Sequence, residues 1–204
     1  MIETGTRAER KERTRRAILD AALELTKSAP LAAVSIRQLA RQAGIQAPSF
    51  YGHFDSIDAV GLALVDESFT SLREALVEVR RGVLRGRDMV RPSVTALTDQ
   101  ARAKREQFSF LARERYAGST VIRQSIRAQL ALIEADLALD LARLLPPSWP
   151  NEDLRLASRL VVLTVVDTFA ELVIDEPAGP EELLDQTLRL LYRQVRAALK
   201  RASA

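Results

Sequence analysis

Apolar residues recur every three or four positions along most of the chain, which is the spacing of amphipathic helices. The longest such stripe predicts one continuous helix and comprises Leu62, Val65, Phe69, Leu72, Leu76, Val79 and Val83. Further stripes predict helices over 10–28, 120–144, 151–175 and 181–199. We therefore expect an all-α fold of about nine helices.

One stretch departs from this spacing. Residues 160–166 are rich in β-branched side chains and resemble a buried strand. No turn signal occurs from Asp153 through Asp175, and no partner strand is evident. We interpret the stretch as a helix that is apolar on most sides and is buried against its own core and a second subunit.

Residues 35–54 predict two short helices joined by a tight turn. Ser35 and Gln38 fit an S-x-x-Q capping box, which predicts a helix start at Ser35. Gly44 supplies a backbone that can turn sharply. The segment therefore has the pattern of a helix-turn-helix.

The second of these helices has an inner and an outer face. Pro48 suits a first helical turn, and Phe50 and Phe54 are spaced to point inward together. The outer face presents small and hydrogen-bonding groups: Gln46, Ala47, Pro48, Ser49, Tyr51, Gly52 and His53. A short helix with such a face is typical of a recognition helix that enters a DNA major groove.

Positive charge gathers at the N-terminal end. Through His53 the basic residues exceed the acidic ones by four, whereas the whole chain has a net charge of +3. A solvated basic tail is one interpretation. Beside a helix-turn-helix, however, the charge indicates a duplex-DNA binder. Arg37 and the Arg-rich arm over 7–16, with Arg13, are predicted to contact phosphates, and the arm is a weaker candidate for the minor groove.

Several classes of site are excluded or disfavoured by composition. The chain has no cysteine and one histidine, which excludes disulfides, zinc–thiolate sites, thiol catalysis and a di-metal bundle of paired Glu-x-x-His motifs. No apolar run approaches the ~20 residues of a membrane span, and no signal peptide is evident. We expect a cytoplasmic protein, associated with the nucleoid when bound to DNA, that has no metal, no cofactor and no enzymatic activity.

The helix-turn-helix resembles that of the TetR/AcrR family of bacterial transcriptional regulators. The matching residues are Ser35, Ile36, Leu39, Ala40, Ala43, Gly44, Ile45, Phe50, Tyr51, His53 and Phe54. The resemblance implies a DNA-binding domain over 1–55, a long linking helix, and a helical effector-binding and dimerisation domain over 56–204. One departure stands out. A phosphate-contacting Lys is usual early in the next helix, and here the segment runs from Asp55 to Asp58.

The resemblance also implies individual roles at the DNA. Ala47, Pro48 and Ser49 face bases, while Gln46 either reads a base pair or caps the helix. Tyr51 and His53 contact phosphates, unless Tyr51 is core and His53 is a structural histidine. Useful specificity needs two half-sites, so we expect a homodimer on a palindromic operator. The last two helices are the implied interface, unless their leucines form intramolecular core.

The effector site is less clearly marked. Candidate lining residues combine apolar walls with polar groups: Phe69, Leu97, Phe108, Phe110, Leu111, Arg113, Tyr116, Trp149, Thr164, Asp167 and Thr168. The alternative is that Arg113 pairs with Glu114 and the aromatics are plain core. Residues 49–67 and 110–126 are similar to the FabR/DesT branch, whose members repress unsaturated fatty acid synthesis, although Gly52 replaces a common Arg. That similarity implies a long-chain acyl-CoA effector, with its phosphates met by Arg102, Lys104, Arg105 or Arg115.

Other functions remain open on the sequence alone. One is a repressor of an efflux or catabolic operon induced by an unrelated hydrophobic small molecule. Another is a DNA-binding architectural protein without an effector. A helical enzyme acting on acyl thioesters is a third, but the chain lacks Cys, a metal-ligand cluster and a Ser-His-acid set.

Overall fold

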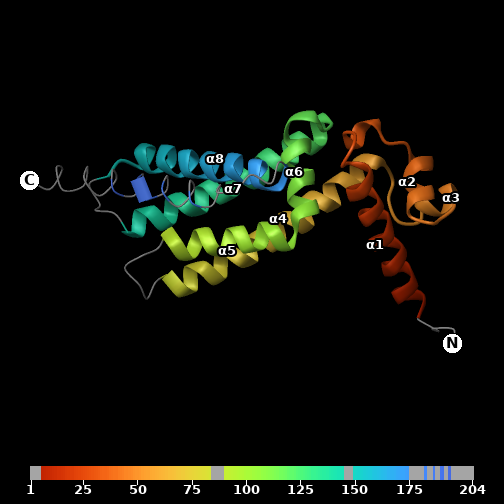
Figure 1. Cartoon of the computed structure of the whole chain (residues 1–204), viewed down its shortest axis with the longest axis horizontal. Helices are drawn as coiled ribbons and strands as arrows, with labels where there is room; N and C mark the ends of the chain where they lie inside the picture. Colours follow the sequence, from red (N-terminus) through yellow and green to blue (C-terminus); the bar gives the residue numbers. More distant parts are fainter. Residues whose placement is uncertain are drawn as a thin grey trace, which may run out of the picture. The chain divides into compact units, whose positions relative to one another are not determined.

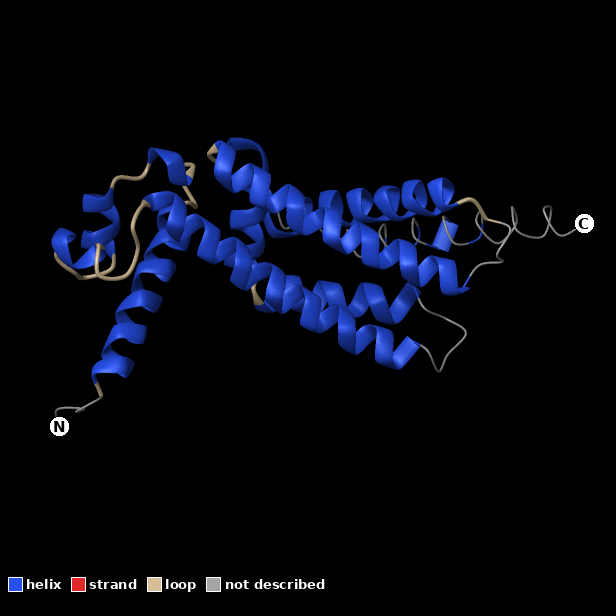
Figure 2. Cartoon of the chain, turned by 180° about the vertical axis from the view of Figure 1, so that it is seen from behind, coloured by secondary structure: helices blue, strands red, loops and turns tan. Residues whose placement is uncertain are grey.

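The computed structural model describes residues 6–83, 90–144 and 149–174, together with single positions at 182, 186, 189, 190 and 193. Within these residues every regular element is a helix (Figure 2), which confirms the all-α prediction. The elements are α1 (Arg7–Leu25), η1 (Leu31–Ala33), α2 (Ile36–Gln42), α3 (Ala47–Phe50), α4 (Ile57–Val83), α5 (Val90–Ala103), α6 (Arg105–Ala117), α7 (Thr120–Leu144) and α8 (Asn151–Ile174) (Figure 1). The helix predicted over 181–199 lies largely outside the described residues.

The β-branched stretch is helical, as predicted. Residues 160–166 lie in the middle of α8, which runs without a break from Asn151 to Ile174. The long stripe likewise forms the single helix α4, and Ser56 precedes it as a cap whose Oγ accepts the N–H of Ala59 at 3.1 Å. The spacing of apolar residues and the absence of turn signals therefore predicted both helices correctly.

The start of the first helix differs from the prediction. Helix α1 begins at Arg7 rather than near residue 10, because Thr6 and Glu9 form a capping box. The Thr6 Oγ1 accepts the N–H of Glu9 at 3.2 Å, and the Glu9 carboxylate accepts the N–H of Thr6 at 2.7 Å. The segment over 7–16, expected as an arm, is therefore helical. Helix α7 begins at Thr120, as predicted, and Ser119 caps it, since its Oγ accepts the N–H of Ile122.

The chain divides into two compact units. The first, which we call the helix-turn-helix unit, contains residues up to Ser68 together with Ser109–Ile126, and the second contains Phe69–Phe108 and Arg127–Ala204. This division differs from the predicted boundary at residue 55, because the start of α4, the end of α6 and the start of α7 belong with the N-terminal helices. Helices α4, α6 and α7 therefore contribute to both units.

The helix-turn-helix unit has a well-packed apolar core. Its fully or almost fully buried side chains come from six α-helices and η1 and include Ile18, Leu19, Leu31, Leu39, Phe50, Val60, Leu64, Phe110, Ile122 and Ile126. At Gly61 the packing leaves no room for a side chain. A Cβ there would lie 2.5 Å from the Cδ1 of Ile122 and 2.9 Å from the Cδ2 of Leu31. Glycine thus lets α4 approach η1 and α7 this closely without displacing the ends of these two side chains.

Candidate nucleic-acid interface

Helix α2 and the turn after it are fixed by local hydrogen bonds. The Oγ of Ser35 accepts the N–H of Gln38 at 3.3 Å, and the Gln38 side-chain oxygen accepts the N–H of Ser35 at 2.9 Å. At the other end, Gly44 has φ +70°. Its N–H bonds to the carbonyl of Arg41, and the N–H of Ile45 bonds to that of Ala40. This pair of bonds is a Schellman motif, which ends α2 and directs the chain into α3.

Helix α3 is anchored from behind by aromatic packing. Phe50 is 0% exposed and Phe54 is 5% exposed, and their ring centroids lie 6.1 Å apart. The guanidinium of Arg15, on α1, lies over the Phe54 ring at 4.4 Å from its centroid. These contacts hold the short helix against the unit, as the spacing of the two phenylalanines predicted.

The outer face of this segment is exposed. Gln46, Pro48, Ser49 and Gly52 are exposed, while Ala47 is half-buried. Tyr51 is 61% exposed, so it is not part of the core. Gln46 occupies the cap position but makes no side-chain capping bond, which leaves its amide available to a ligand.

His53 differs from its neighbours because it is half-buried. Its Nδ1 is buried and has no hydrogen-bond partner in the part of the chain that the structure describes. A structural histidine normally satisfies its buried nitrogen. The two roles predicted for His53, structural or in contact with phosphate, both stay predictions.

The basic residues near this surface are of two kinds. Arg37, in the first turn of α2, and Arg13, on α1, are exposed. Arg16 is instead engaged within the unit, at 2.7 Å from both Asp20 and Glu67. The hydrogen bond to Asp20, with that to Glu67, raises the pKa of Arg16. Arg16 therefore ties α1 to α4, and the phosphate contacts of Arg37 and Arg13 stay predictions.

The missing Lys at the start of α4 leaves two carboxylates in the same region. Asp58 does not point freely into solvent, since its Oδ1 accepts the hydroxyl of Ser119 at 2.8 Å and the residue is half-buried. Asp55, by contrast, is exposed.

The predicted effector residues are divided between the two units. In the helix-turn-helix unit, Phe110 and Leu111 are buried core, while Tyr116 is 71% exposed. Arg113 does not pair with Glu114: it donates to the carbonyls of Thr26, at 3.0 Å, and Lys27. The alternative in which Arg113 pairs with Glu114 is therefore wrong, because each of these two side chains has a different partner on another segment.

In the second unit the predicted residues also lie in varied surroundings. Phe69 and Leu97 are buried, Phe108 and Trp149 are half-buried, and Asp167 is exposed. The hydroxyls of Thr164 and Thr168 donate to backbone carbonyls one turn earlier, both at 2.9 Å. These two hydroxyls are thus committed to their own helix α8. Whether any of the residues contacts an effector stays a prediction.

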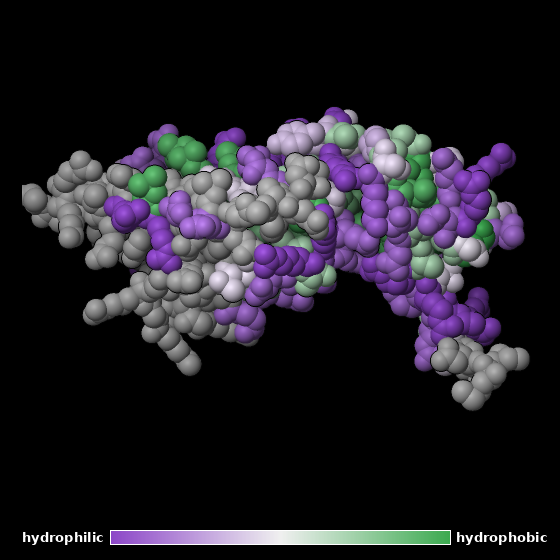
Figure 3. Space-filling model, viewed as in Figure 1, coloured by the Kyte–Doolittle hydropathy of each residue, from purple (hydrophilic) through white to green (hydrophobic). Residues whose placement is uncertain are grey.

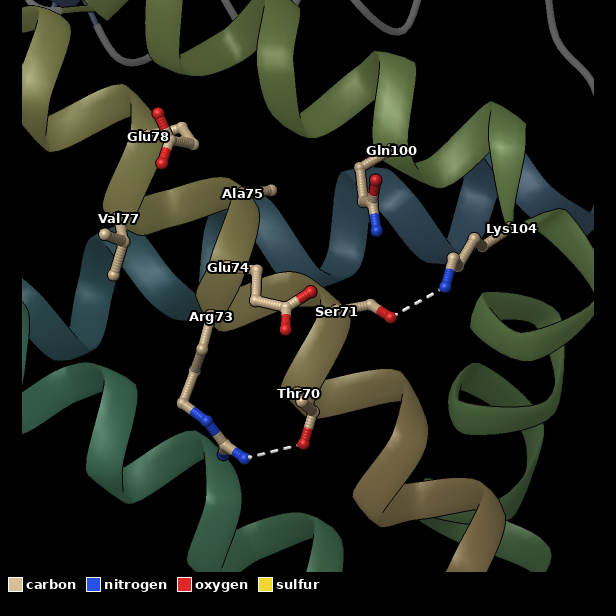
Figure 4. Close-up of a pocket in the computed structure, with 9 residues that line it drawn as sticks. All are labelled: Thr70, Ser71, Arg73, Glu74, Ala75, Val77, Glu78, Gln100 and Lys104. Carbon is tan, nitrogen blue, oxygen red and sulfur yellow. Dashed lines mark hydrogen bonds between the residues drawn. The ribbon is translucent and has the colours of Figure 1, made fainter.

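A groove of about 760 Å³ lies between α4 and α5 (Figure 4). Apolar atoms make up most of its surface, although most of its lining residues are polar: Thr70, Ser71, Arg73, Glu74, Ala75, Val77, Glu78, Gln100 and Lys104. The Lys104 ammonium donates to the Ser71 hydroxyl at 2.7 Å, and Arg73 bonds to Gln129 and Thr70. None of the predicted lining residues borders this groove. Of the residues that line the groove, only Lys104 was predicted to have a role in effector binding, as a phosphate contact.

The signal for this groove was present in the sequence. Polar side chains at 71, 74 and 78 on α4, at 100 on α5 and at 104 just after α5 recur at helical spacing beside the apolar stripes. The two sets could not be paired in advance, because the register between the helices depends on their packing.

Among the described residues no helix is long and apolar enough to cross a membrane. In the same residues no cluster of His, Cys, Asp and Glu could hold a metal ion.

Solved structures share this fold at low sequence identity. NalD of Pseudomonas aeruginosa, the secondary repressor of the MexAB-OprM multidrug efflux pump, superposes with a TM-score of 0.65 at 21% identity, over 89% of this chain and 96% of that one. FadR of Bacillus subtilis, solved with stearoyl-CoA, gives 0.64 at 16% identity, over 86% and 96%. A putative TetR-family regulator of Syntrophomonas wolfei gives 0.69 at 13% identity, over 91% and 96%. At these identities the likeness concerns the fold.

Two family models match the chain in sequence. Residues 18–64 match the tetR family of bacterial regulatory proteins, and residues 87–194 match the tetracyclin repressor-like C-terminal domain. The first match contains the capped α2, the turn at Gly44 and the anchored α3, and the second covers more than half of the chain. The protein therefore belongs to the TetR family and is a DNA-binding transcription regulator.

Proposed function

We propose that this protein is a dimeric, sequence-specific repressor that binds a palindromic operator through α3 and is controlled by a small hydrophobic effector. The observation that carries the proposal is the two-sided α3 segment. Phe50 is fully buried and anchors the helix, while Tyr51, the next residue, is 61% exposed. A helix fixed from behind can present its outer atoms to base edges without a large ordering cost.

The outer residues divide into base readers and phosphate contacts. Ser49 can hydrogen-bond a base edge, and the apolar atoms of Ala47 and Pro48 can contact thymine methyl groups. Tyr51, His53, Arg37 and Arg13 would hold phosphates and set the register. Phosphate contacts should make binding salt-dependent, whereas loss of the Ser49 hydroxyl should change the preferred sequence.

A dimer is supported by exposed leucines on α8. Leu156, Leu160 and Leu163 are spaced by four and three residues, so they lie on one face, and each is at least 38% exposed. Figure 3 shows hydrophobic residues at the surface over α8, at the upper left. Apolar residues that share one helix face are expected to be covered in the functional assembly.

For the effector we favour a long-chain acyl-CoA, which would make the targets genes of unsaturated fatty acid synthesis or desaturation. The support is the similarity of residues 49–67 and 110–126 to the FabR/DesT branch, and a fold shared with a regulator solved with stearoyl-CoA. The fold is shared equally with an efflux-pump repressor. The second candidate is therefore a repressor of an efflux or catabolic operon with a different hydrophobic inducer.

The test begins with selection of a binding site from random duplex DNA, followed by gel shifts on the selected and scrambled sequences. We expect a palindromic site, and binding of the scrambled duplex only in dilute salt. Equal affinity for both duplexes would indicate an architectural protein and would reject the repressor. Oleoyl-CoA, palmitoyl-CoA and free CoA are then added. A shift in operator affinity with the acylated forms alone supports the fatty acid role, and no shift at saturation discards that role.

A further inference from the structure

Two adjacent residues of α6 hold the segment that joins α1 to η1. Arg113 donates to the carbonyls of Thr26 and Lys27 at the end of α1. Glu114 accepts the backbone N–H of Leu31, the first residue of η1, with Oε1 at 2.8 Å. We call these contacts the α6 clamp. They fix both ends of the segment over 26–31, just before the helix-turn-helix begins at Ser35.

Glu114 is an unusual carboxyl because it is completely buried. Its exposure is 0%, and its Oε2 has no hydrogen-bond partner among the described residues. Gly118, one turn later, makes room for it: a Cβ at that position would lie 2.7 Å from Oε2. The chain thus uses a glycine to admit a polar side chain whose second oxygen is not satisfied.

The charges around Glu114 do little to stabilise its ionised form. Asp58 on α4 is a like charge, and it is held nearby by Ser119. Arg123 on α7 donates to the Gly118 carbonyl, and Arg113 on α6 is engaged with α1. Burial raises the pKa of Glu114, the Leu31 N–H opposes that rise, and the charge of Asp58 adds to it. The clamped form therefore favours the neutral carboxylic acid.

Ionisation of Glu114 and opening of the segment should occur together. A carboxylate that is buried with one hydrogen bond is costly, and water is the best available partner for it. If the Glu114 side chain moves out into water, the Leu31 N–H loses its acceptor. A buried N–H without an acceptor costs roughly 1–3 kcal/mol, so η1 is expected to open as well.

We propose that the α6 clamp is a latch that regulates DNA binding: release of Leu31 by Glu114 loosens the segment before α2 and lowers operator affinity. A loosened segment increases the ordering cost of binding, which is subtracted from the interaction with DNA. Ionisation of Glu114, or a movement of α6 that withdraws its side chain, would each release the latch. This inference rests on the proposed DNA-binding function.

The test compares the wild type with Glu114→Gln, whose amide oxygen can still accept from Leu31 but which cannot ionise. Operator affinity is measured by fluorescence anisotropy from about pH 5.5 to about pH 8.5, a range above the ordinary pKa of a glutamate. We expect the wild type to lose affinity as the pH rises and Glu114→Gln to lose less. The ratio of the two affinities should grow by up to about tenfold for each unit of difference in pKa between the clamped and released forms.

Two further variants serve as controls. Glu12→Gln makes the same change of charge at an exposed position of α1 and should keep the wild-type pH profile. Asp58→Asn keeps an acceptor for Ser119 but removes the like charge that raises the pKa of Glu114, so it should shift the loss of affinity to lower pH. Identical pH profiles for the wild type and Glu114→Gln would overturn the latch.

A second measurement does not depend on DNA. Hydrogen exchange of peptides covering 26–35, compared between wild type and Glu114→Gln at the same pH, should be faster in the wild type at high pH and equal at low pH. If the wild type binds no duplex at all, the proposed function fails while this exchange difference still decides the latch. Equal exchange at every pH rejects it.

Discussion

The helix-turn-helix unit and the second unit place their polar side chains differently. In the first, polar groups on the outer face of α3 surround an anchor that is fully buried. In the second, polar groups line an open groove, and leucines of α7 and α8 are exposed, with Leu139 at 59% and Leu156 at 57%. In the first unit, the outer face of α3 is formed by the chain alone. In the second unit, the exposed leucines and the open groove are surfaces that an effector or another subunit would cover.

The difference follows from how each surface is assembled. The surface proposed to face DNA comes from one short segment whose two aromatic anchors, Phe50 and Phe54, are close in the chain. The groove needs α4 and α5 in register, and a dimer face needs a second chain. We therefore expect substitutions in the first unit to act on folding and DNA contact separately, and those in the second to act through assembly.

The largest effect on stability is expected at the α3 anchor. Phe50→Ala removes a fully buried ring and should lower the free energy of unfolding by ~3–5 kcal/mol, because it leaves a cavity as well as losing burial. Urea unfolding followed by circular dichroism measures the change. Operator binding should be lost in the same variant.

Tyr51→Ala is the matched control, since the neighbouring ring is 61% exposed. It should change the free energy of unfolding by no more than ~0.5 kcal/mol, as is usual for surface sites, and yet weaken binding to all duplexes. A large loss of stability in Tyr51→Ala, or a small one in Phe50→Ala, would contradict the two-sided description of α3.

The next effect should appear in assembly. Leu160→Glu places a charge on the apolar face of α8 and is expected to shift sedimentation from dimer to monomer. Operator affinity should fall by ~10²-fold or more, because the two half-sites are no longer bound by one linked particle. Leu139→Glu on α7 is the control with a similar exposure and should leave the dimer intact. A dimer that survives Leu160→Glu would remove α8 from the interface.

The sequence was sufficient where partners are close along the chain. The box at Ser35 and Gln38, the turn at Gly44 and the anchor at Phe50 were all predicted, since each depends on neighbours within a few positions. The same rule applied to Thr6 and Glu9, a T-x-x-E box, would have placed the start of α1 correctly. The sequence therefore contains a local signal for this helix start.

Partners far apart in the chain could not be identified in this way. Glu114 and Leu31 are separated by 83 positions, and nothing local marks the carboxyl of Glu114 as buried. Adjacent charges such as Arg113 and Glu114 suggested a pair, yet successive residues on a helix point in different directions. Their true partners follow from the packing of α6 on α1 and η1, which a single sequence does not specify.

A smaller effect tests that packing. Gly61→Ala adds a methyl group within 2.9 Å of two side chains and should cost ~1–3 kcal/mol of stability through overpacking. Combining it with Ile122→Val removes the Cδ1 atom that would lie 2.5 Å away, so the double variant should recover part of the loss. Equal stability of Gly61→Ala and the wild type would mean that η1 and α7 can move apart freely, and the unit would be looser than its core suggests.

The smallest effect on stability is expected in the first turn of α1. It tests whether these residues form a helix or a flexible arm in solution. Thr6→Ala removes the hydroxyl that accepts the Glu9 N–H, and loss of such a cap typically costs ~1 kcal/mol. Because the capped turn is at the exposed end of α1, we expect local fraying rather than loss of the unit. Hydrogen exchange over 7–13 should increase while the global unfolding midpoint changes little. Thr6→Ser, which keeps an acceptor, should restore protection. If the wild type already exchanges as fast as Thr6→Ala, these residues form an arm in solution, and Arg13 would reach phosphates from a flexible segment.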